Sequence, residues 1–368
     1  MGLVLAALVA IGVIVAIVAS TRSSGSSSPS RALATVHGVI GSEKRPFFDD
    51  PRVQAEFRAK GYSVVIDTAG SRQIATSVDL SKYDFAFPAG APAARQILAK
   101  EKLSTSYTVF YTPMVVASFL PIAKLLVKAG VATDQGGYYT LDMSAFMDLV
   151  ANNTRWSDLP GNTAYPSDKS ILITSTDVRT SNSAAMYLAI TSYVANRNNV
   201  VENVTQGDAV LPRVAPFFLR QGFVESSSEE PFDDYLAIGV GKTPMVMIYE
   251  AQFLARVFAG DSAISPDMVL LYPDPDVLSK HTLVPISDAG DAVGQLLVND
   301  PVLQGLAVRY GFRTADASQF KEQIRTHPVP IPDTIVDLVE PPTYEALEHM
   351  IEGISAMYET AGAQGGTT

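Results

Sequence analysis

Residues 170–196, with the sequence SILITSTDVRTSNSAAMYLAITSYVAN, decide the fold that we expect. The apolar run at 171–173 predicts a short buried strand. Residues 174–183 are polar and carry six Ser or Thr hydroxyls. Apolar residues then recur every three or four positions over 186–194, which is the spacing of one face of a helix. A strand therefore leads through a hydroxyl-rich loop into the N-terminus of a helix.

The start of that helix has a possible physical use. The first turn of a helix leaves backbone N–H groups unpaired and carries a partial positive charge, so a small polar or anionic ligand can bind there. Ser and Thr hydroxyls would complete the set of donors. In the alternative interpretation, Thr180, Ser181, Asn182 and Ser183 only cap the helix. Both interpretations are open at this point.

The composition indicates a folded protein of about two domains. The chain has 368 residues, of which 47% are hydrophobic, and these can fill two cores. A formal net charge of -11, without any run of Lys or Arg, argues against nucleic acid as a partner. The chain has no cysteine, which excludes disulfides, thiolate metal sites and a cysteine nucleophile.

The N-terminal segment, residues 1–20, is expected to be a transmembrane anchor or a signal segment. Residues 2–19 carry no charge and are just long enough to cross a membrane as one helix. A Ser/Gly-rich linker follows over residues 21–33. We expect a single-pass protein of the cell membrane with its main body extracytoplasmic, or a secreted protein if the segment is cleaved. Arg22 and Arg31 would place the body in the cytoplasm by the positive-inside rule, which we set aside because the downstream chain has an extracytoplasmic character.

Strands and helices alternate in the first half of the chain. Residues 32–40, 62–67 and 83–87 predict strands, and small or polar residues and a helix follow each of them. This alternation is typical of a parallel sheet in an α/β domain. Ligands of such sheets bind beyond the carboxyl ends of the strands. Three residues fall at these ends: Ser42, Ser71 and Ala89.

The second half repeats the theme. Residues 244–250 predict a buried strand that leads into a helix, and 268–272 and 283–286 predict further strands. A last helix is expected over 344–358. The sequence GAQGGTT at 362–368 is expected to be disordered.

In this order, the pieces resemble a type II periplasmic solute-binding protein, nearest to the phosphate and molybdate branch. Gly41-Ser42 matches the Gly-Ser that follows the first strand of that family, and residues 68–75 (TAGSRQIA) resemble its second-strand ligand turn. Residues 149–159 (LVANNTRWSDL) resemble the segment that opens the second lobe. Residues 171–183 are similar to the strand and loop that clamp an oxyanion. The stretch 272–313 resembles the return segment of the fold.

The resemblance implies an α/β fold of two lobes with mixed sheets, preceded by one N-terminal hydrophobic helix. Two segments near 115–118 and 241–249 would connect the lobes, which would close on a solute. The expected domain bounds are 34–116 and 245–330 for a discontinuous lobe I, 117–244 for lobe II, and 331–368 for a C-terminal extension with one helix and a disordered tail.

The resemblance also implies a ligand site between the lobes. Phosphate binders place an Arg and an Asp around a Gly-rich turn, whereas loop 175–183 has no glycine, so the ligand's identity stays open. Glu250 would disfavour an anion unless it is protonated or paired, and the alternative is that it pairs with a nearby Arg or faces water. The candidate ligand-binding residues are Ser42, Gly70, Ser71, Arg72, Ala89, Thr176, Arg179, Thr180, Ser181, Asn182, Tyr249 and Glu250.

Other kinds of site fit the sequence poorly. Residues 239–243 (GVGKT) lack the glycine that a phosphate-binding loop needs at position 236, and Pro244 follows instead of a helix. The four histidines lie far apart, and no G-x-S-x-G motif is present. The acidic stretch 225–234 is interpreted as solvated surface. We therefore expect no catalytic residue, no metal and no cofactor, and a protein that is not an enzyme.

Two functions remain. The first is a membrane-tethered or exported solute-binding protein that captures a small polar or oxyanion ligand between two lobes for an ABC-type transporter. The alternative is a transport-independent sensor or scaffold domain of a membrane complex with the same fold. The expected partners are the ligand, a transporter permease and, through the N-terminal segment, the membrane. Stabilisation by a small molecule would distinguish the two functions, because only a binding protein gains RT ln(1 + [L]/Kd) from its ligand.

Overall fold

A computed structural model describes residues 33–221, 225, 227–332, 334–335 and 337–365. The predicted N-terminal hydrophobic helix and all but the last residue of the predicted linker lie outside these residues. Of the helices that the structure describes, none has both the length and the hydropathy that a membrane span requires.

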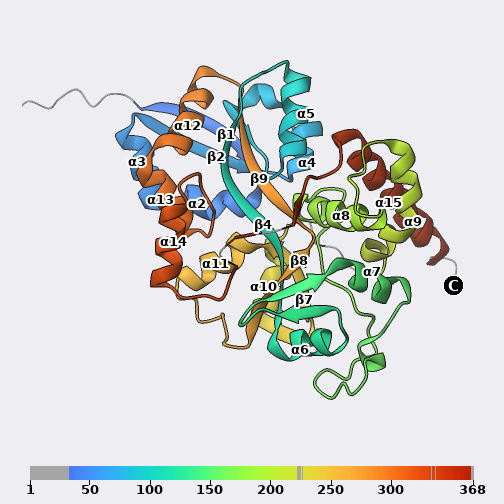
Figure 1. The fold of residues 1–368 in the computed structure, drawn as a ribbon. Coiled ribbons are helices and arrows are strands. Elements are labelled where there is room, and N and C mark those ends of the chain that lie inside the picture. The colour runs from blue at the N-terminus through green and yellow to red at the C-terminus, as the bar shows by residue number, and fades with distance from the viewer. Residues whose placement is uncertain (1–32, 222–224, 226, 333, 336, 366–368) are drawn as a thin grey trace, which may run out of the picture.

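One mixed sheet runs through the molecule, and its long strands β4 and β9 pair with each other (Figure 1). β1 pairs in parallel with β2 and β3, so the carboxyl ends of these strands meet at one edge. β9 runs antiparallel to both β3 and β4. The strands are β1 (Ala34–Ile40), β2 (Tyr62–Thr68), β3 (Phe85–Phe87), β4 (Tyr107–Phe119), β5 (Ala132–Asp134), β6 (Tyr139–Asp142), β7 (Met245–Tyr249), β8 (Met268–Asp274), β9 (Asp276–Pro285) and β10 (Leu338–Val339).

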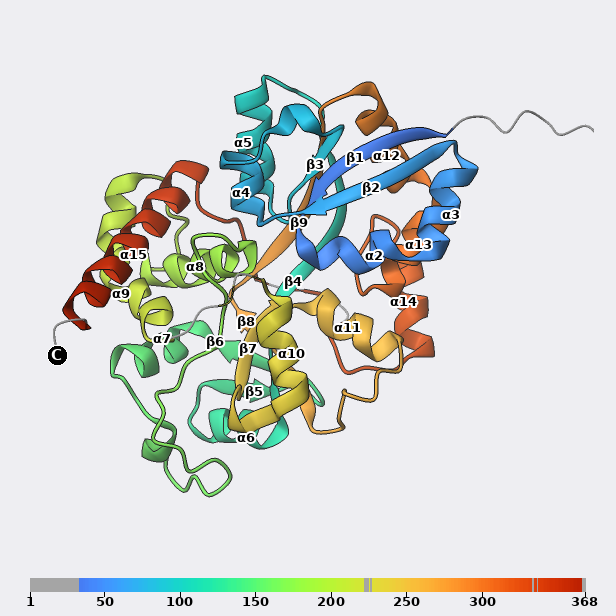
Figure 2. The same cartoon turned by 180° about the vertical axis from the view of Figure 1, so that it is seen from behind.

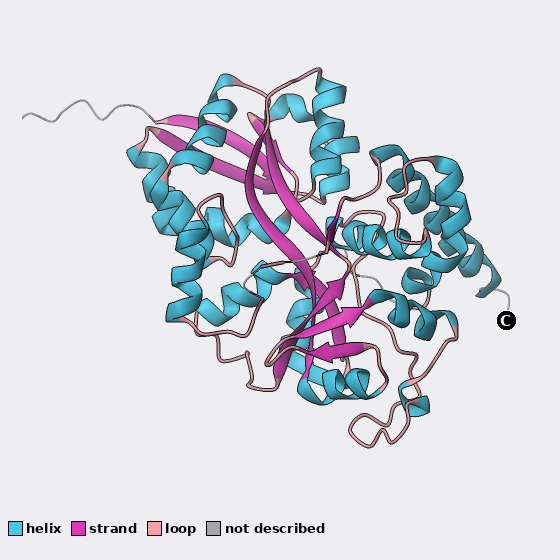
Figure 3. Ribbon diagram, in the orientation of Figure 1, coloured by secondary structure: helices cyan, strands magenta, loops and turns pink. Residues whose placement is uncertain are grey.

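Helices pack around both halves of this sheet (Figure 3). The short β1, β2 and β3 alternate with helices, as the sequence predicts. Around the first half lie α2 (Arg45–Asp49), α3 (Pro51–Ala59), α4 (Ser71–Thr76), α5 (Ala91–Glu101), α11 (Glu250–Phe258), α12 (Asp288–Asn299), α13 (Pro301–Arg309) and α14 (Ala317–Thr326). Around the second lie α6 (Leu120–Lys128), α7 (Met143–Ala151), α8 (Asn182–Ala195), α9 (Val204–Leu219), α10 (Glu229–Ile238) and α15 (Tyr344–Gly365).

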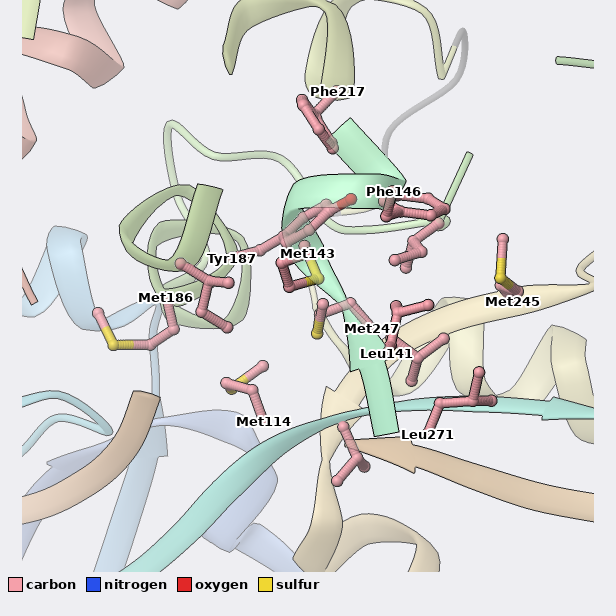
Figure 4. Close-up of a cluster of buried hydrophobic side chains, with 14 of the residues drawn as sticks. Met114, Leu141, Met143, Phe146, Met186, Tyr187, Phe217, Met245, Met247 and Leu271 are labelled. Atoms are coloured by element: carbon pink, nitrogen blue, oxygen red, sulfur yellow. The ribbon is translucent and has the colours of Figure 1, made fainter. Parts of the chain in front are cut away.

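Two separate kinds of core define two lobes. Lobe I, which holds β1, β2, β3 and β9, has a core rich in phenylalanine, in which Phe47 packs edge-on against Phe110 with ring centroids 5.3 Å apart. Lobe II, which holds β5 to β8, has a core that contains several methionines as well as aromatic residues; Figure 4 shows Met143 beside Tyr187, and Met186 in the same cluster. Because each lobe buries its own apolar surface, the lobes can move relative to each other as rigid units.

The strand pairing differs from the predicted domain bounds. A boundary at 245 would assign residues 245–249 and 268–274 to lobe I, whereas β7 and β8 both pair with the second half of β4, in lobe II. These two apolar runs need a sheet position covered on both faces, and the centre of lobe II provides it. The chain consequently crosses between the lobes more often than the two predicted crossings: along β4, from β7 to α11, from α11 to β8, from β8 to β9, and along 327–343.

The stretch around α8 also differs locally from its prediction. Residues 171–173 are not a regular strand; only Thr174 forms a bridge, with Val246, in which the Thr174 N–H donates to the Met245 carbonyl at 2.9 Å. The helix follows as predicted, but it is buried on nearly all sides rather than on one face. α7, α9, α15 and β7 all pack against it.

The C-terminal extension packs on lobe II. α15 lies against α9, and the helix continues to Gly365 instead of ending at 358. The predicted disordered tail is therefore helical over 362–365, where Ala363 and Gln364 favour a helix; residues 366–368 lie outside the described residues.

Candidate ligand-binding site between the lobes

A cavity of about 260 Å3 lies between the two lobes, and we call it the first cavity. Lobe I contributes the segments that follow β1 and β2, whose carboxyl ends meet at this edge of the sheet. Lobe II contributes the loop before α8 and a short segment before α10. The walls are formed by residues 41–43, 68–71, 73, 180–182, 227–228 and Tyr249.

The structure brings most of the predicted site residues to this cavity. They come from sequence positions up to 207 residues apart, counted from Ser42 to Tyr249. Their use by a ligand stays a prediction. Those that line the cavity are Ser42, Gly70, Ser71, Thr180, Ser181, Asn182 and Tyr249. Those that do not line it are Arg72, Ala89, Thr176, Arg179 and Glu250.

The N-terminus of α8 has unpaired backbone donors, and its first residue, Asn182, lines the first cavity. Within the described residues, the N–H groups of Asn182, Ser183 and Ala184 have no acceptor, and the first backbone bond of the helix runs from the Ala185 N–H to the Ser181 carbonyl at 3.2 Å. No side chain caps this end. The alternative, in which the side chains of these residues cap the helix, is therefore contradicted by the absence of such hydrogen bonds among the described residues. The backbone N–H groups remain available to a ligand or to water.

Hydroxyl groups surround these donors. Ser181 and Ser183 place their Oγ atoms 3.0 Å apart, and the buried Thr176 lies behind them with its Oγ1 2.9 Å from that of Ser183. Thr176 therefore orients the loop rather than facing the cavity. Each hydroxyl has one proton and can turn it toward a ligand oxygen.

The lobe I wall is fixed by backbone contacts. The Ala89 N–H donates to Ser71 Oγ at 2.8 Å, which explains why Ala89 supports the site without lining it. The Gly70 N–H donates to Gln73 Oε1 at 3.1 Å. A side chain at Gly70 would collide with the Thr180 carbonyl of lobe II, so glycine is what lets the lobes approach here.

Tyr249 adds a neutral donor at the end of β7. Asn182 Nδ2 donates to the Tyr249 hydroxyl at 3.0 Å, which leaves the phenol proton available to another acceptor. Burial raises the pKa of Tyr249, with a smaller contribution from the charge of Glu43. The phenol therefore stays protonated throughout the physiological range.

The charged residues that we predicted in the site do not line the cavity and pair with other side chains instead. Arg179 Nε donates to Asp177 Oδ1 at 2.8 Å, and the guanidinium lies over the Tyr358 ring. The buried Glu250 accepts two hydrogen bonds from Arg313, at 2.8 and 2.9 Å. The stated alternative for Glu250, pairing with an Arg, is confirmed. No Arg or Lys is among the residues that line the first cavity.

Arg72 joins the lobes beside the cavity. Its Nε donates to Glu348 Oε2 of α15 at 2.6 Å, and its Nη1 donates to the Arg179 carbonyl at 3.2 Å. Ser42 Oγ lies 3.3 Å from Ser227 Oγ across the gap. The lobes are thus in contact around the first cavity.

Sequence reasoning missed Glu43, which lines the cavity next to Ser42. Lys44 Nζ donates to Glu43 Oε1 and to His281 Nδ1, the latter at 3.3 Å, and both Lys44 and His281 are fully buried. Burial alone would raise the pKa of Glu43, but the charge of Lys44 and the contacts with His281 lower it to about 2. Glu43 is therefore ionised. Its place directly after the Gly41-Ser42 pair was a usable signal, whereas the contact of its partner Lys44 with His281, 237 residues away, was not.

Sequence reasoning also missed the segment before α10. Ser227 and Ser228 lie in the cavity wall, although the stretch 225–234 was interpreted as solvated surface. The stretch is mostly acidic and has three serines in a row at 226–228, and nothing local in the sequence shows that Ser227 and Ser228 face a cleft.

Comparisons with known proteins bear on the fold. No protein-family model and no curated protein matches the chain. Among solved structures, the sulfate-binding protein SubI of Mycobacterium tuberculosis aligns with a TM-score of 0.51 at 14% identity, over 85% of this chain and 96% of SubI. Iron-bound HitA of Pseudomonas aeruginosa gives 0.53 at 13% identity, over 87% and 99%. An ABC transporter structure from Clostridium perfringens gives 0.51 at 10% identity, over 88% and 98%.

The chain has the fold of the type II solute-binding proteins. The predicted resemblance is confirmed at this level. At identities of 10 to 14%, the likeness shows the fold alone. The first cavity lies between the two lobes of this fold.

Proposed function

We propose that this protein is a solute-binding protein that captures a small polar or anionic ligand between its lobes and delivers it to an ABC-type transporter. The N-terminal segment 1–20 would anchor it to the membrane or export it. SubI, which is described as binding sulfate, has the same fold, and so does the C. perfringens structure described as an ABC transporter.

One observation carries the proposal. Asn182, whose backbone N–H has no acceptor among the described residues, lines one cavity together with Ser71 and Ser181, and these residues come from different lobes. Fixed dipoles of this kind bind polar groups without covalent chemistry and without a formal positive charge. Polar groups buried between two rigid lobes also stabilise the closed state, because they find hydrogen-bond partners only when the lobes are closed and a ligand is bound.

A thermal-shift screen on the full-length chain in detergent tests the proposal. Candidate ligands are phosphate, sulfate, molybdate, tungstate, amino acids and sugars. A true ligand at about 100 times its Kd adds about 2.7 kcal/mol of stability and raises Tm. If no compound raises Tm, the sensor or scaffold alternative replaces transport.

The site assignment has its own test. Ser181→Ala and Ser71→Ala should each abolish the shift given by the ligand found, because each removes a hydroxyl from the cavity wall. Ser77→Ala, at an exposed position at the C-terminal end of α4, serves as the control and should retain the shift. Survival of the shift in both cavity variants would remove the assignment.

A further inference from the structure

A second cavity, of about 190 Å3, lies beside the sheet of lobe II and shares no lining residue with the first. Its walls come from β6 and β8, which pair in parallel and lie side by side in Figure 2, from the first residue of β9, and from part of the segment that leads from α14 to α15. Its volume is below the roughly 300–1,000 Å3 of drug-sized ligand pockets, so it suits a short molecule.

Asp276 gives the second cavity an unsatisfied polar atom. The residue lines the cavity and is only 1% exposed. Its Oδ1 accepts the Val277 N–H at 2.7 Å, whereas its Oδ2 has no hydrogen-bond partner among the described residues. Buried polar side-chain atoms are rarely left unpaired, so an unpaired one in a cavity wall points to an occupant.

The charge around the second cavity favours a cation. Asp274 and Asp337 line the cavity together with Asp276, whereas no described Lys, Arg or His does. Burial, and then the charges of Asp337 and Asp142, raise the pKa of Asp274, which indicates that these carboxyl groups lie close together without a positive partner. A positively charged occupant would remove this repulsion and would pair with Oδ2 of Asp276.

The other walls favour an organic cation over a metal ion. They include the rings of Tyr138 and Tyr272, which meet edge to face with centroids 5.5 Å apart, and the apolar Pro332 and Ile335. Aromatic rings attract an ammonium group, whereas Ca2+ needs about six to eight oxygen ligands. Among the described residues, no three acidic or histidine side chains are placed to share a metal ion.

We propose that the second cavity binds a small organic amine in its ammonium form. The ammonium group donates to Oδ2 of Asp276, and the short apolar chain lies against the rings of Tyr138 and Tyr272. Asp274 and Asp337 complete the negative surroundings of the cation. Because Asp274 belongs to β8 and Asp337 to the segment between α14 and α15, the occupant would also tie this segment to the sheet of lobe II.

Binding of the ammonium group should release a proton. Burial raises the pKa of Asp276, and the charge of Glu250 adds to the shift. The N–H groups of Val277 and Met114 offset it only in part. The other ionisable groups in the cavity wall are Tyr138, Tyr272, Asp274 and Asp337. None of these can supply a positive charge, so the free protein holds Asp276 protonated and a cation at Oδ2 ionises it.

Four solutes test the site on the full-length chain in detergent, by isothermal titration calorimetry. n-Butylamine carries the charge and the apolar chain, 1-butanol lacks the charge, ammonium chloride lacks the chain, and calcium chloride supplies a metal ion. We expect 1-butanol and ammonium chloride to bind at least about tenfold more weakly than n-butylamine. The enthalpy of n-butylamine binding should change with the ionisation enthalpy of the buffer, because a proton is released.

Three results of these titrations would overturn the proposal. Equal affinity of 1-butanol would show that Asp276 stays protonated and that the site is neutral. Tighter binding of Ca2+ than of n-butylamine would make it a metal site. Absence of n-butylamine binding would remove the site, and it would leave the proposed function standing, since the two cavities share no lining residue.

Substitutions locate the ammonium group. Asp276→Asn should lower the affinity for n-butylamine at least about tenfold and abolish the dependence on the buffer. Asp148→Asn, at an exposed position of α7, removes the same charge from lobe II and should change neither. Unchanged n-butylamine binding by folded Asp276→Asn would contradict the inference.

A double variant covers the case in which Asp276→Asn does not fold. Asp274 and Asp337 are both exposed, and asparagine tolerates the left-handed backbone of Asp337, whose φ is 53°. Asp274→Asn with Asp337→Asn should therefore fold and should lower the affinity for n-butylamine at least about twofold, since exposed charges are partly screened. Unchanged affinity in this variant would also contradict the inference.

Discussion

Two buried tyrosines of lobe II differ in one hydrogen bond. The Tyr235 hydroxyl donates to the Ser118 carbonyl at 2.6 Å, whereas the Tyr187 hydroxyl has no partner among the described residues. Tyr235→Phe should lower the free energy of unfolding by about 1–2 kcal/mol, and Tyr187→Phe should leave it unchanged or raise it slightly, because no bond is lost. Urea denaturation of both variants gives the comparison. Equal losses would contradict the assigned hydrogen bonds.

The buried His281 predicts a loss of stability in mild acid. Burial, and then the charge of Lys44, lower its pKa from 6.5 to about 4. The unfolded chain therefore takes up a proton near pH 6.5 that the folded protein accepts only near pH 4, so stability is complete above pH 6.5 and falls as the pH drops toward 4. Between about pH 7 and pH 5 the loss should be roughly 2 kcal/mol.

Denaturation curves across this pH range test the sign and the residue. His281→Gln should flatten the dependence, and His37→Gln, at an exposed position of β1, should retain it. Glu43 contributes at lower pH: because its folded pKa is about 2, its stabilisation is present above about pH 4.5 and is lost below that. A stability that is constant from pH 7 to pH 5 would show that His281 is not buried as described.

At this scale, the sequence predicted small hydroxyl residues better than charged ones. Ser42, Ser71 and Ser181 follow strands or precede helices, and that local position is enough to bring them to the cleft. Arg179 pairs with Asp177, only two residues away. Arg72 and Glu250 have charged side chains that reach Glu348 and Arg313, on distant parts of the chain. Pairing of this kind depends on the tertiary fold, so no local pattern shows it.

The pair of Arg72 and Glu348 connects helix α4 of lobe I to α15 of lobe II. Both side chains are mostly buried, with 28% and 15% of their surface exposed. Because this ion pair forms across the cleft, opening the lobes would break it, and it should contribute to ligand affinity. Glu348→Gln should weaken binding of the ligand found in the screen about two- to fivefold, as expected of a partly exposed pair worth up to about 1 kcal/mol.

A second pair of α15 supplies the control. His349 Nε2 lies 2.7 Å from Asp208 Oδ1 of α9, and both residues belong to lobe II. Asp208→Asn disturbs the same helix without touching lobe I, so it should leave ligand affinity unchanged. The same loss of affinity in both variants would mean that α15 acts only by stabilising lobe II.

At the scale of helices and strands, the alternation of strands and helices in the sequence predicted the structure better than the apolar runs did. β1, β2 and β3 with the helices that follow them are close to their predicted positions because each unit is local. The runs at 171–173 and 268–274 are equally apolar, yet only the second is a strand. An apolar run shows that a segment is buried; whether it joins a sheet depends on a free strand edge, and the second half of β4 pairs with β7 and β8.

For the whole molecule, the contact between Ser42 and Ser227 predicts that the closed form can be locked. The natural chain has no cysteine, so Ser42→Cys with Ser227→Cys creates the only possible disulfide. Their Oγ atoms are 3.3 Å apart, which suits a disulfide after a small adjustment. The oxidised double variant should gain roughly 2–4 kcal/mol of stability and release bound ligand far more slowly than the reduced form.

The reduced double variant and the single Ser42→Cys variant are the controls: both lack the cross-link, so they give the rate of ligand release that the side-chain changes alone produce. Rates of ligand release before and after reduction give the measurement. Failure of the disulfide to form under mild oxidation would show that the lobes do not approach each other in solution as they do here.

The two-lobed organisation was predicted from the order of motifs, but its boundaries were not. The resemblance predicts a crossing near 115–118, which lies in β4, but the change of lobe comes earlier in the strand: residues up to Pro113 pair with β9, and 114–118 pair with β7. It cannot show that the chain returns to lobe II for β8 and again for α15, because strand order in a sheet follows from pairing between distant segments.

The described chain begins on lobe I, at β1, and ends on lobe II, with α15 (Figure 1). A donor dye attached near residue 33 and an acceptor dye attached at the end of α15 would therefore sit on opposite sides of the hinge. Energy transfer between them would record each opening and closing event in single molecules, with no label placed near the cleft.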